Sequence, residues 1–181
     1  MKILLTAILT LLIFTGCNEK TTNDTTKTAS EEVPKEASNG IVLYDTSGQE
    51  IKVKSLENGY IFEGYENKIV LVNFFATWCP PCKAEIPHLN NLQEKYKKDI
   101  KIISILLEEN KSNEDLIEFI NYYDIEFTIT NSKDNYKLAQ EVGGVSSIPF
   151  MLIYDRNGKY FQHYTGMVPE EMLEADIKKV L

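Results

Sequence analysis

Two cysteines near the middle of the chain have the spacing and the neighbours for redox chemistry. The segment Ala76–Pro87 reads ATWCPPCKAEIP and places Cys79 and Cys82 three positions apart. On the first turn of a helix, such a pair has its Cα atoms about 5 Å apart, within the range of a disulfide. The free N–H groups and the positive dipole end of that helix favour a thiolate on Cys79. Because a thiolate is the species that attacks a disulfide, the segment indicates thiol–disulfide exchange.

Metal binding and stapling of the fold are the alternative uses of this pair. A structural metal site needs about four ligands, and the chain adds only His88 and His163 to the two cysteines. A staple across so short a loop restricts the unfolded chain far less than a long-range bridge. Peroxide-reducing thiols are preceded by a threonine at the position where this chain has Ala76, which argues against that class. We therefore expect no metal site and no cofactor.

The first residues are typical of a targeting segment. Lys2 gives a positive start, and residues 3–14 form an uncharged apolar run. As a helix this run reaches about 18 Å, against a hydrocarbon core of roughly 30 Å, so it predicts a signal peptide over residues 1–16 rather than a membrane span. The stretch FTGC at residues 14–17 resembles the bacterial lipobox, which predicts lipidation of Cys17. An ordinary soluble exported protein is the alternative; lipidation would remove the odd cysteine and leave the central pair.

Composition separates a tether from a folded domain. Residues 18–39 are dominated by Thr, Lys, Glu, Asn, Ser and Ala and contain no aromatic residue. Such a segment cannot bury enough apolar surface to offset its ordering entropy, so we expect a disordered, lipidated tether over residues 17–39. Residues 40–181 have the length of one domain. The formal net charge of −8 argues against a nucleic-acid partner, which requires a basic face.

Hydrophobic periodicity divides residues 40–181 into alternating strands and helices. Nearly continuous apolar runs predict strands buried on both faces, and apolar spacings of three and four predict helices. Asn157-Gly158 between two apolar runs predicts a hairpin turn. These elements predict an α/β fold with a central mixed sheet and helices on both faces. The predicted strands are a hairpin over 40–53, then 68–75, 100–107, 127–130, 149–154 and 160–164, and the predicted helices are 80–98, kinked at Pro87, 113–123, 136–142 and 170–181.

Two stretches, NFFATWCPPCKAEIP and VSSIPFMLIYDRNGKYFQHYTG, resemble the thioredoxin superfamily and, within it, the exported TlpA/ResA-like branch of thiol-disulfide oxidoreductases. The resemblance covers about residues 40–181. It implies a thioredoxin fold with an N-terminal β-hairpin and a helix-containing insertion, for which residues 113–123 are the candidate.

The resemblance also implies a substrate groove in this chain. Pro149 matches the loop proline that is cis in the superfamily and lies beside the two cysteines, where it shapes a groove for an extended substrate. Trp78 matches the aromatic residue that flanks the first cysteine, with a role in packing as its alternative. The predicted groove residues are Trp78, Pro80, Pro81, Ile148 and Pro149.

The residue expected to transfer protons in this chain differs from the one in thioredoxin itself. Thioredoxin has a buried aspartate at the strand position where this chain has Asn73, and an asparagine cannot take up or release a proton near neutral pH. The TlpA/ResA-like branch carries a glutamate three residues after the second cysteine, which here is Glu85. If its side chain turns inward, burial raises its pKa toward a useful range for proton transfer. An exposed glutamate favoured by the helix dipole is the alternative.

These features together predict an exported disulfide reductase, tethered by lipid to a bacterial membrane on its extracytoplasmic (periplasmic) side. Its expected partners are protein thiols and disulfides and a membrane electron-donor protein. The resemblance implies substrates such as apocytochrome c thiols before haem attachment. Two alternatives remain: an oxidase that introduces disulfides, and a peptide-binding module without redox turnover.

Overall fold

The computed structural model describes residues 40–181, so the predicted signal peptide, Cys17 and the tether lie outside the described residues. The described part begins with a three-stranded antiparallel sheet formed by β1 (Ile41–Tyr44), β2 (Glu50–Leu56) and β3 (Gly59–Phe62). Strands β1 and β2 confirm the predicted hairpin, whereas β3 was not predicted. The Asn-Gly dipeptide at 58–59, a strong hairpin signal, marks the turn before β3 in the sequence.

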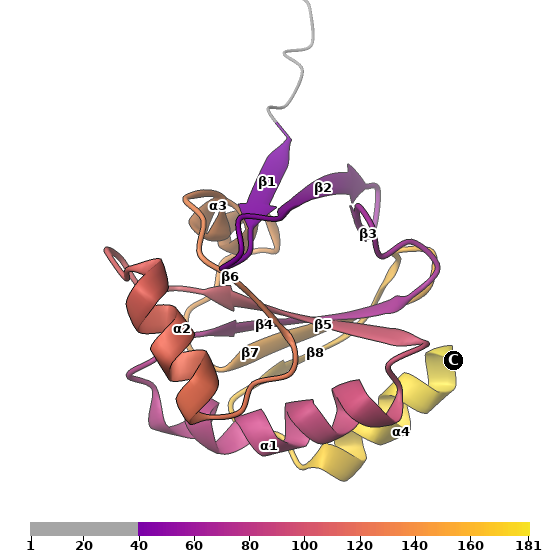
Figure 1. Cartoon of the computed structure of the whole chain (residues 1–181). Coiled ribbons are helices and arrows are strands. Elements are labelled where there is room, and N and C mark those ends of the chain that lie inside the picture. The colour runs from indigo at the N-terminus through magenta and orange to yellow at the C-terminus, as the bar shows by residue number, and fades with distance from the viewer. Residues whose placement is uncertain (1–39) are drawn as a thin grey trace, which may run out of the picture. The chain divides into compact units, whose positions relative to one another are not determined.

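Five further strands form the central sheet in the order β6–β5–β4–β7–β8 (Figure 1). Strand β4 pairs in parallel with β5, and β5 with β6, whereas β7 and β8 run antiparallel to their neighbours. The predicted mixed sheet is therefore confirmed. The strands are β4 (Ile69–Phe75), β5 (Ile100–Leu106), β6 (Thr128–Thr130), β7 (Phe150–Tyr154) and β8 (Tyr160–Thr165).

Strand β4 lies at the centre of this sheet, and all seven of its residues are buried. Because successive side chains point to opposite faces, alternate residues belong to two separate hydrophobic clusters. Leu71 and Phe75 belong to one cluster, and Val72 and Phe74 belong to the other. By the same alternation, Asn73 shares the face of Leu71 and Phe75.

Helices cover both faces of the central sheet, as predicted (Figure 1). Helices α1, α2 and α4 pack on the face of Leu71, which we call the α1 face. Helix α3 and the three-stranded sheet pack on the opposite face, which we call the α3 face. No helix within residues 40–181 has the length and apolar content to cross a bilayer. The helices are α1 (Pro80–Lys95), α2 (Asn113–Tyr122), α3 (Asp134–Glu141) and α4 (Glu170–Val180).

Two hairpin turns tie the N-terminal sheet to the edge of the central sheet. The Tyr60 N–H donates to the Gly158 carbonyl at 2.8 Å, and the Tyr160 N–H donates to the Asn58 carbonyl at 2.9 Å. The two backbones approach so closely that a side chain on Gly59 would overlap the Gly158 carbonyl. These contacts bring Tyr60 and Tyr160 together on the α3 face.

Candidate functional site

A disulfide joins Cys79 to Cys82 at the start of α1. The two Cα atoms are 5.3 Å apart, which confirms the spacing expected from the sequence. Cys79 exposes 2% of its surface and Cys82 exposes 3%. Both belong to the same hydrophobic cluster as Ile86 and Leu89 of α1. The redox pair is thus enclosed by the apolar core of the α1 face.

The two prolines between the cysteines determine which backbone N–H donates a hydrogen bond to Cys79. Pro80 and Pro81 occupy the first two positions of α1 and have no N–H group. The first N–H of the helix is therefore that of Cys82, which donates to Cys79 Sγ at 3.3 Å. Cys79 is the N-cap of α1, so its sulfur lies at the positive end of the helix dipole. After reduction, the same geometry stabilises a thiolate on Cys79.

The loop before β7 lies against the same sulfur atom. The Ile148–Pro149 peptide bond is cis, as the resemblance implies. The Ile148 carbonyl oxygen lies 3.9 Å from Cys79 Sγ. Pro149 is buried, and its carbonyl accepts a hydrogen bond from the Gly166 N–H at 2.8 Å. The sequence stretches around 79 and 149, far apart along the chain, therefore meet at the disulfide.

The other predicted groove residues border the disulfide with exposed apolar surface. Trp78 exposes 64% of its surface, and Pro80 and Pro81 are also exposed. Ile148 is half-buried. The exposure of Trp78 argues against its alternative role as a packing residue, although binding of substrate by these side chains stays a prediction.

A side-chain clamp that was not predicted holds the chain just before the cysteines. Thr77 donates to Glu108 Oε2 twice, from its backbone N–H at 3.0 Å and from its hydroxyl at 2.6 Å. Glu108 follows β5, so the end of that strand fixes the loop that carries Trp78 and Cys79. A pair separated by 31 residues gives no local sequence signal, and only the parallel pairing of β4 with β5 brings it together.

Glu85 turns inward from α1 and is fully buried, so the alternative of an exposed glutamate is wrong. Its Oε2 accepts a hydrogen bond from the Val168 N–H at 3.1 Å, and its Oε1 has no partner within residues 40–181. Burial raises the pKa of Glu85, and the smaller effects of the Val168 hydrogen bond and of His88 lower it. No local pattern in the sequence marks the Val168 contact. The part of Glu85 in proton transfer stays a prediction.

Asn73 is the second buried polar side chain of interest on the α1 face. Its Nδ2 donates to Ser104 Oγ at 3.1 Å, and its Oδ1 has no partner among the described residues. An amide cannot exchange a proton near neutral pH, so of Asn73 and Glu85 only Glu85 can act as an acid or base here. Residues 40–181 contain no group of three His, Cys, Asp or Glu side chains that could hold a metal ion.

A family model for thioredoxin-like proteins matches residues 67–160, just over half of the chain. The chain belongs to the thioredoxin-like family. The thioredoxin fold implied by the sequence resemblance is thereby confirmed, with the N-terminal sheet as an addition before the matched residues.

Relatives within the thioredoxin-like family carry thiol–disulfide names. The thiol-disulfide oxidoreductase ResA of Bacillus thuringiensis subsp. konkukian (strain 97-27) is 32% identical over 86% of this chain and 82% of its own length. The protein of that name from Bacillus cereus (strain ATCC 10987 / NRS 248) is 32% identical over 82% of this chain and 79% of its own length.

Solved structures of bacterial proteins share this fold. A thiol:disulfide interchange protein DsbE from Chlorobium tepidum has a TM-score of 0.63 and 25% identity, over 78% of this chain and 92% of that chain. StoA from Bacillus subtilis, at 19% identity, has the same fold with a TM-score of 0.58 over 76% of this chain and 95% of its own. Together with the close Cys79–Cys82 pair, these findings support a thiol–disulfide redox role for this thioredoxin-like chain.

Proposed function

We propose that this thioredoxin-like protein is an exported, membrane-tethered reductase of protein disulfides. The observation that carries the proposal is the position of Cys79. Its sulfur caps α1, accepts the Cys82 N–H and lies 3.9 Å from the Ile148 carbonyl oxygen. A sulfur in that position has both the electrostatic environment of a thiolate and a backbone edge beside it along which a substrate can lie.

The exchange proceeds in two steps. The Cys79 thiolate of the reduced protein attacks one sulfur of a substrate disulfide, and the other substrate sulfur leaves as a thiolate. Cys82 then loses its proton, attacks Cys79 Sγ in the mixed disulfide and releases the second substrate thiolate. Two electrons pass from the protein dithiol to the substrate, and the protein is left with the Cys79–Cys82 disulfide.

Glu85 is our candidate for the group that receives the Cys82 proton. It lies one turn after Cys82 on α1, it is buried, and burial raises its pKa from the ordinary carboxyl range toward neutral pH. Asn73 cannot substitute for it, because an amide does not titrate.

The groove residues bind the substrate chain. An extended segment pairs with the backbone at Ile148 while its apolar side chains contact Trp78, Pro80 and Pro81. Pro149 closes the loop beside the disulfide without offering an N–H of its own. This arrangement accepts many sequences, because the backbone rather than a specific side chain makes the main contact.

We place the protein outside the cytoplasm, anchored to a bacterial membrane through lipid on Cys17. In an exported compartment a dithiol must be reduced continually, so the proposal includes a membrane electron-donor protein as partner. Apocytochrome c thiols before haem attachment are the proposed substrate class. Incorporation of labelled palmitate, abolished in a Cys17→Ser variant, tests the anchor.

Two measurements on the full chain test the reductase. The protein should accelerate insulin reduction by dithiothreitol, and no acceleration beyond the reductant alone would contradict the proposal. Equilibration with glutathione buffers gives the potential of the pair. A value below about −200 mV supports reduction, whereas a value near or above about −150 mV favours the oxidase alternative.

A further inference from the structure

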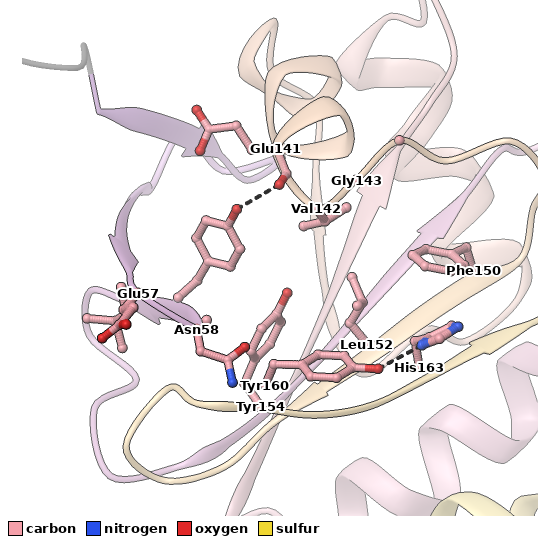
Figure 2. A pocket seen from close by; sticks show the side chains of 14 residues that line it. Glu57, Asn58, Glu141, Val142, Gly143, Phe150, Leu152, Tyr154, Tyr160 and His163 are labelled. Atoms are coloured by element: carbon pink, nitrogen blue, oxygen red, sulfur yellow. Dashed lines mark hydrogen bonds between the residues drawn. The ribbon is translucent and has the colours of Figure 1, made fainter.

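A pocket of about 430 Å³ opens on the α3 face of the central sheet, away from the cysteines (Figure 2). It lies between the β2–β3 turn, the end of α3 and the strands β7 and β8. Fourteen residues line it, and its character comes from four aromatic rings, those of Tyr60, Phe150, Tyr154 and Tyr160. The pocket takes no part in the thiol chemistry described above, so its lining needs a separate explanation.

Three tyrosine rings form an angular wall. The centroids of Tyr60 and Tyr154 are 5.8 Å apart with their planes at 88°, and those of Tyr154 and Tyr160 are 6.4 Å apart at 71°. All three rings line the pocket, and ring faces carry negative electrostatic potential. This is the arrangement that attracts organic cations.

The hydroxyl of Tyr154 is the most informative group in the pocket. Tyr154 is 2% exposed, and it is one of the residues that line the pocket. Figure 2 shows its hydroxyl pointing into the pocket, whereas the hydroxyls of Tyr60 and Tyr160 reach the Glu141 carbonyl and His163 Nδ1 at 3.1 and 2.7 Å. Burial raises the pKa of Tyr154, so the phenol stays neutral and can accept a hydrogen bond from a ligand.

The charges around the pocket have one sign. Glu57 and Glu141 are among its lining residues, which include neither Lys nor Arg. Helix α3 ends at Glu141, so the negative end of its dipole also faces this space. Anionic ligands are therefore disfavoured, and a cation meets rings, carboxylates and a helix C-terminus together.

We propose that this pocket binds a basic side chain, lysine or arginine, of the protein whose disulfide is exchanged at Cys79. The ammonium or guanidinium group contacts the tyrosine faces and donates to the Tyr154 hydroxyl, while Glu57 and Glu141 neutralise its charge. The identity of the occupant as a substrate residue rests on the proposed function; the preference for a cation does not.

One short loop connects the pocket to the disulfide. Gly143 and Gly144 line the pocket, and Ile148 in the same loop lies against Cys79 Sγ. Phe150, which lines the pocket, directly follows Pro149. A substrate chain paired at Ile148 therefore continues over this loop toward the tyrosines, so a basic residue a few positions from the reacting cysteine can enter the pocket.

Binding is tested without redox chemistry, on the oxidised full chain. N-acetyl-lysine methylamide is titrated while the NMR signals of Tyr60, Tyr160 and His163 are followed, with the norleucine and glutamate derivatives as matched probes. The lysine derivative should bind about fivefold more tightly than the norleucine derivative. Equal binding of the two, or tighter binding of the glutamate derivative, would overturn the cation preference.

The link to substrate is tested with peptides that carry one cysteine as a pyridyl disulfide. Each peptide has a lysine at a fixed offset from the cysteine, and its partner has norleucine there. With the reduced protein, lysine at the matching offset should raise the rate of pyridinethione release about fivefold. No rate difference at any offset would overturn the link. If no peptide reacts at all while the lysine derivative still binds, the redox function fails and the cation site stands.

Variants with matched controls separate local charge from net charge. Glu57→Gln with Glu141→Gln should reduce the fivefold rate advantage to less than about twofold. Glu114→Gln with Glu118→Gln removes the same charge from the exposed face of α2 and should leave the advantage intact. Equal losses in both double variants would show that only net charge matters and would overturn the proposal.

Discussion

On the α1 face of the central sheet, the Cys79–Cys82 disulfide and Glu85 are packed within the core. The α3 face instead carries an open pocket walled by tyrosines and lined by carboxylates. The buried face holds groups whose reactivity depends on exclusion of water: a sulfur at a helix N-terminus and a carboxyl with a raised pKa. The open face holds groups that suit recognition of a cation, namely tyrosine rings, the Tyr154 hydroxyl and two acidic residues, Glu57 and Glu141.

The two faces separate the reacting groups from the groups proposed to select a substrate. Groups that react need a low-dielectric, preorganised surrounding, whereas groups that recognise a charged side chain must border a space that this side chain can enter. The segment 143–150 borders both regions, so the proposed substrate contact at Ile148 and the pocket share one loop. Variants in one region should therefore change one property and leave the other.

The largest effect is expected from Cys79→Ser. Loss of the attacking thiolate should reduce insulin reduction to the rate of dithiothreitol alone, because Cys82 has no equivalent position at the helix cap. The lysine derivative should bind this variant as well as it binds the unaltered protein. Insulin turbidity and the NMR titration measure the two properties. Retained reductase activity would break the assignment of chemistry to the α1 face.

The next largest effect is expected from Phe62→Ala on the α3 face. Phe62 is 2% exposed, and the centroid of its ring lies 6.0 Å from that of Tyr154. Truncation therefore leaves a cavity where the N-terminal sheet meets the central sheet. The free energy of unfolding should fall by about 4 kcal/mol. Urea denaturation measures the change, and Tyr44→Ala, at an exposed position, should cost less than about 0.5 kcal/mol.

A smaller kinetic effect is expected from Glu85→Gln. Without a group to take up the Cys82 proton, resolution of the mixed disulfide should slow by about 100-fold at neutral pH, and its pH dependence should lose the step that reports Glu85. Stopped-flow release of a peptide thiol measures it. Glu94→Gln, an exposed change on the same helix, should leave the profile unaltered. An unchanged profile in Glu85→Gln would reject the role.

The same residue predicts a pH dependence of stability. The pKa of Glu85 is raised in the folded protein, so the folded state binds more protons than the unfolded state between the ordinary carboxyl pKa and the raised one. The stability contributed by protonated Glu85 is therefore complete at low pH and is lost as pH rises through that interval. Relative to Glu85→Gln, the unaltered protein should become less stable with rising pH, and an opposite trend in urea midpoints would contradict the burial argument.

The smallest effect is expected from Tyr154→Phe. The substitution keeps the buried ring and removes only the hydroxyl that points into the pocket (Figure 2), so the free energy of unfolding should change by less than about 0.5 kcal/mol. The preference for lysine over norleucine should nevertheless fall, because the hydroxyl no longer accepts a hydrogen bond from the ammonium group. A large loss of stability would show that the hydroxyl serves the fold rather than a ligand.

The α1 face could be predicted from the sequence because its signals are local. Cys79, Pro80, Pro81 and Cys82 lie within one helical turn, and the apolar runs of β4 and β5 are continuous. Glu85 was singled out by the family resemblance, which places a glutamate three residues after the second cysteine, and the sequence left open whether its side chain pointed inward. Pro149 required the family resemblance, since nothing in its own neighbours marks a cis bond.

The pocket on the α3 face could not be predicted, because its parts come from separate segments. The pocket needs β3, the end of α3 and the β7–β8 hairpin, and β3 was missed. Tyr60 and Tyr160 are brought together only by the backbone contacts between the turns at 58–59 and 155–158. The Thr77–Glu108 clamp was missed for the same reason: the sequence shows each residue but not the pairing of strands that joins them.

The central claim, that Cys79 is the sulfur that exchanges bonds with a substrate, is tested most directly by trapping. Reduced full-length Cys82→Ser is mixed with a disulfide-bonded peptide, and intact mass followed by proteolytic mapping locates any adduct. A stable mixed disulfide on Cys79 is expected, with no such adduct in the Cys79→Ser variant. An adduct found on Cys17 alone, or no adduct at all, would contradict it.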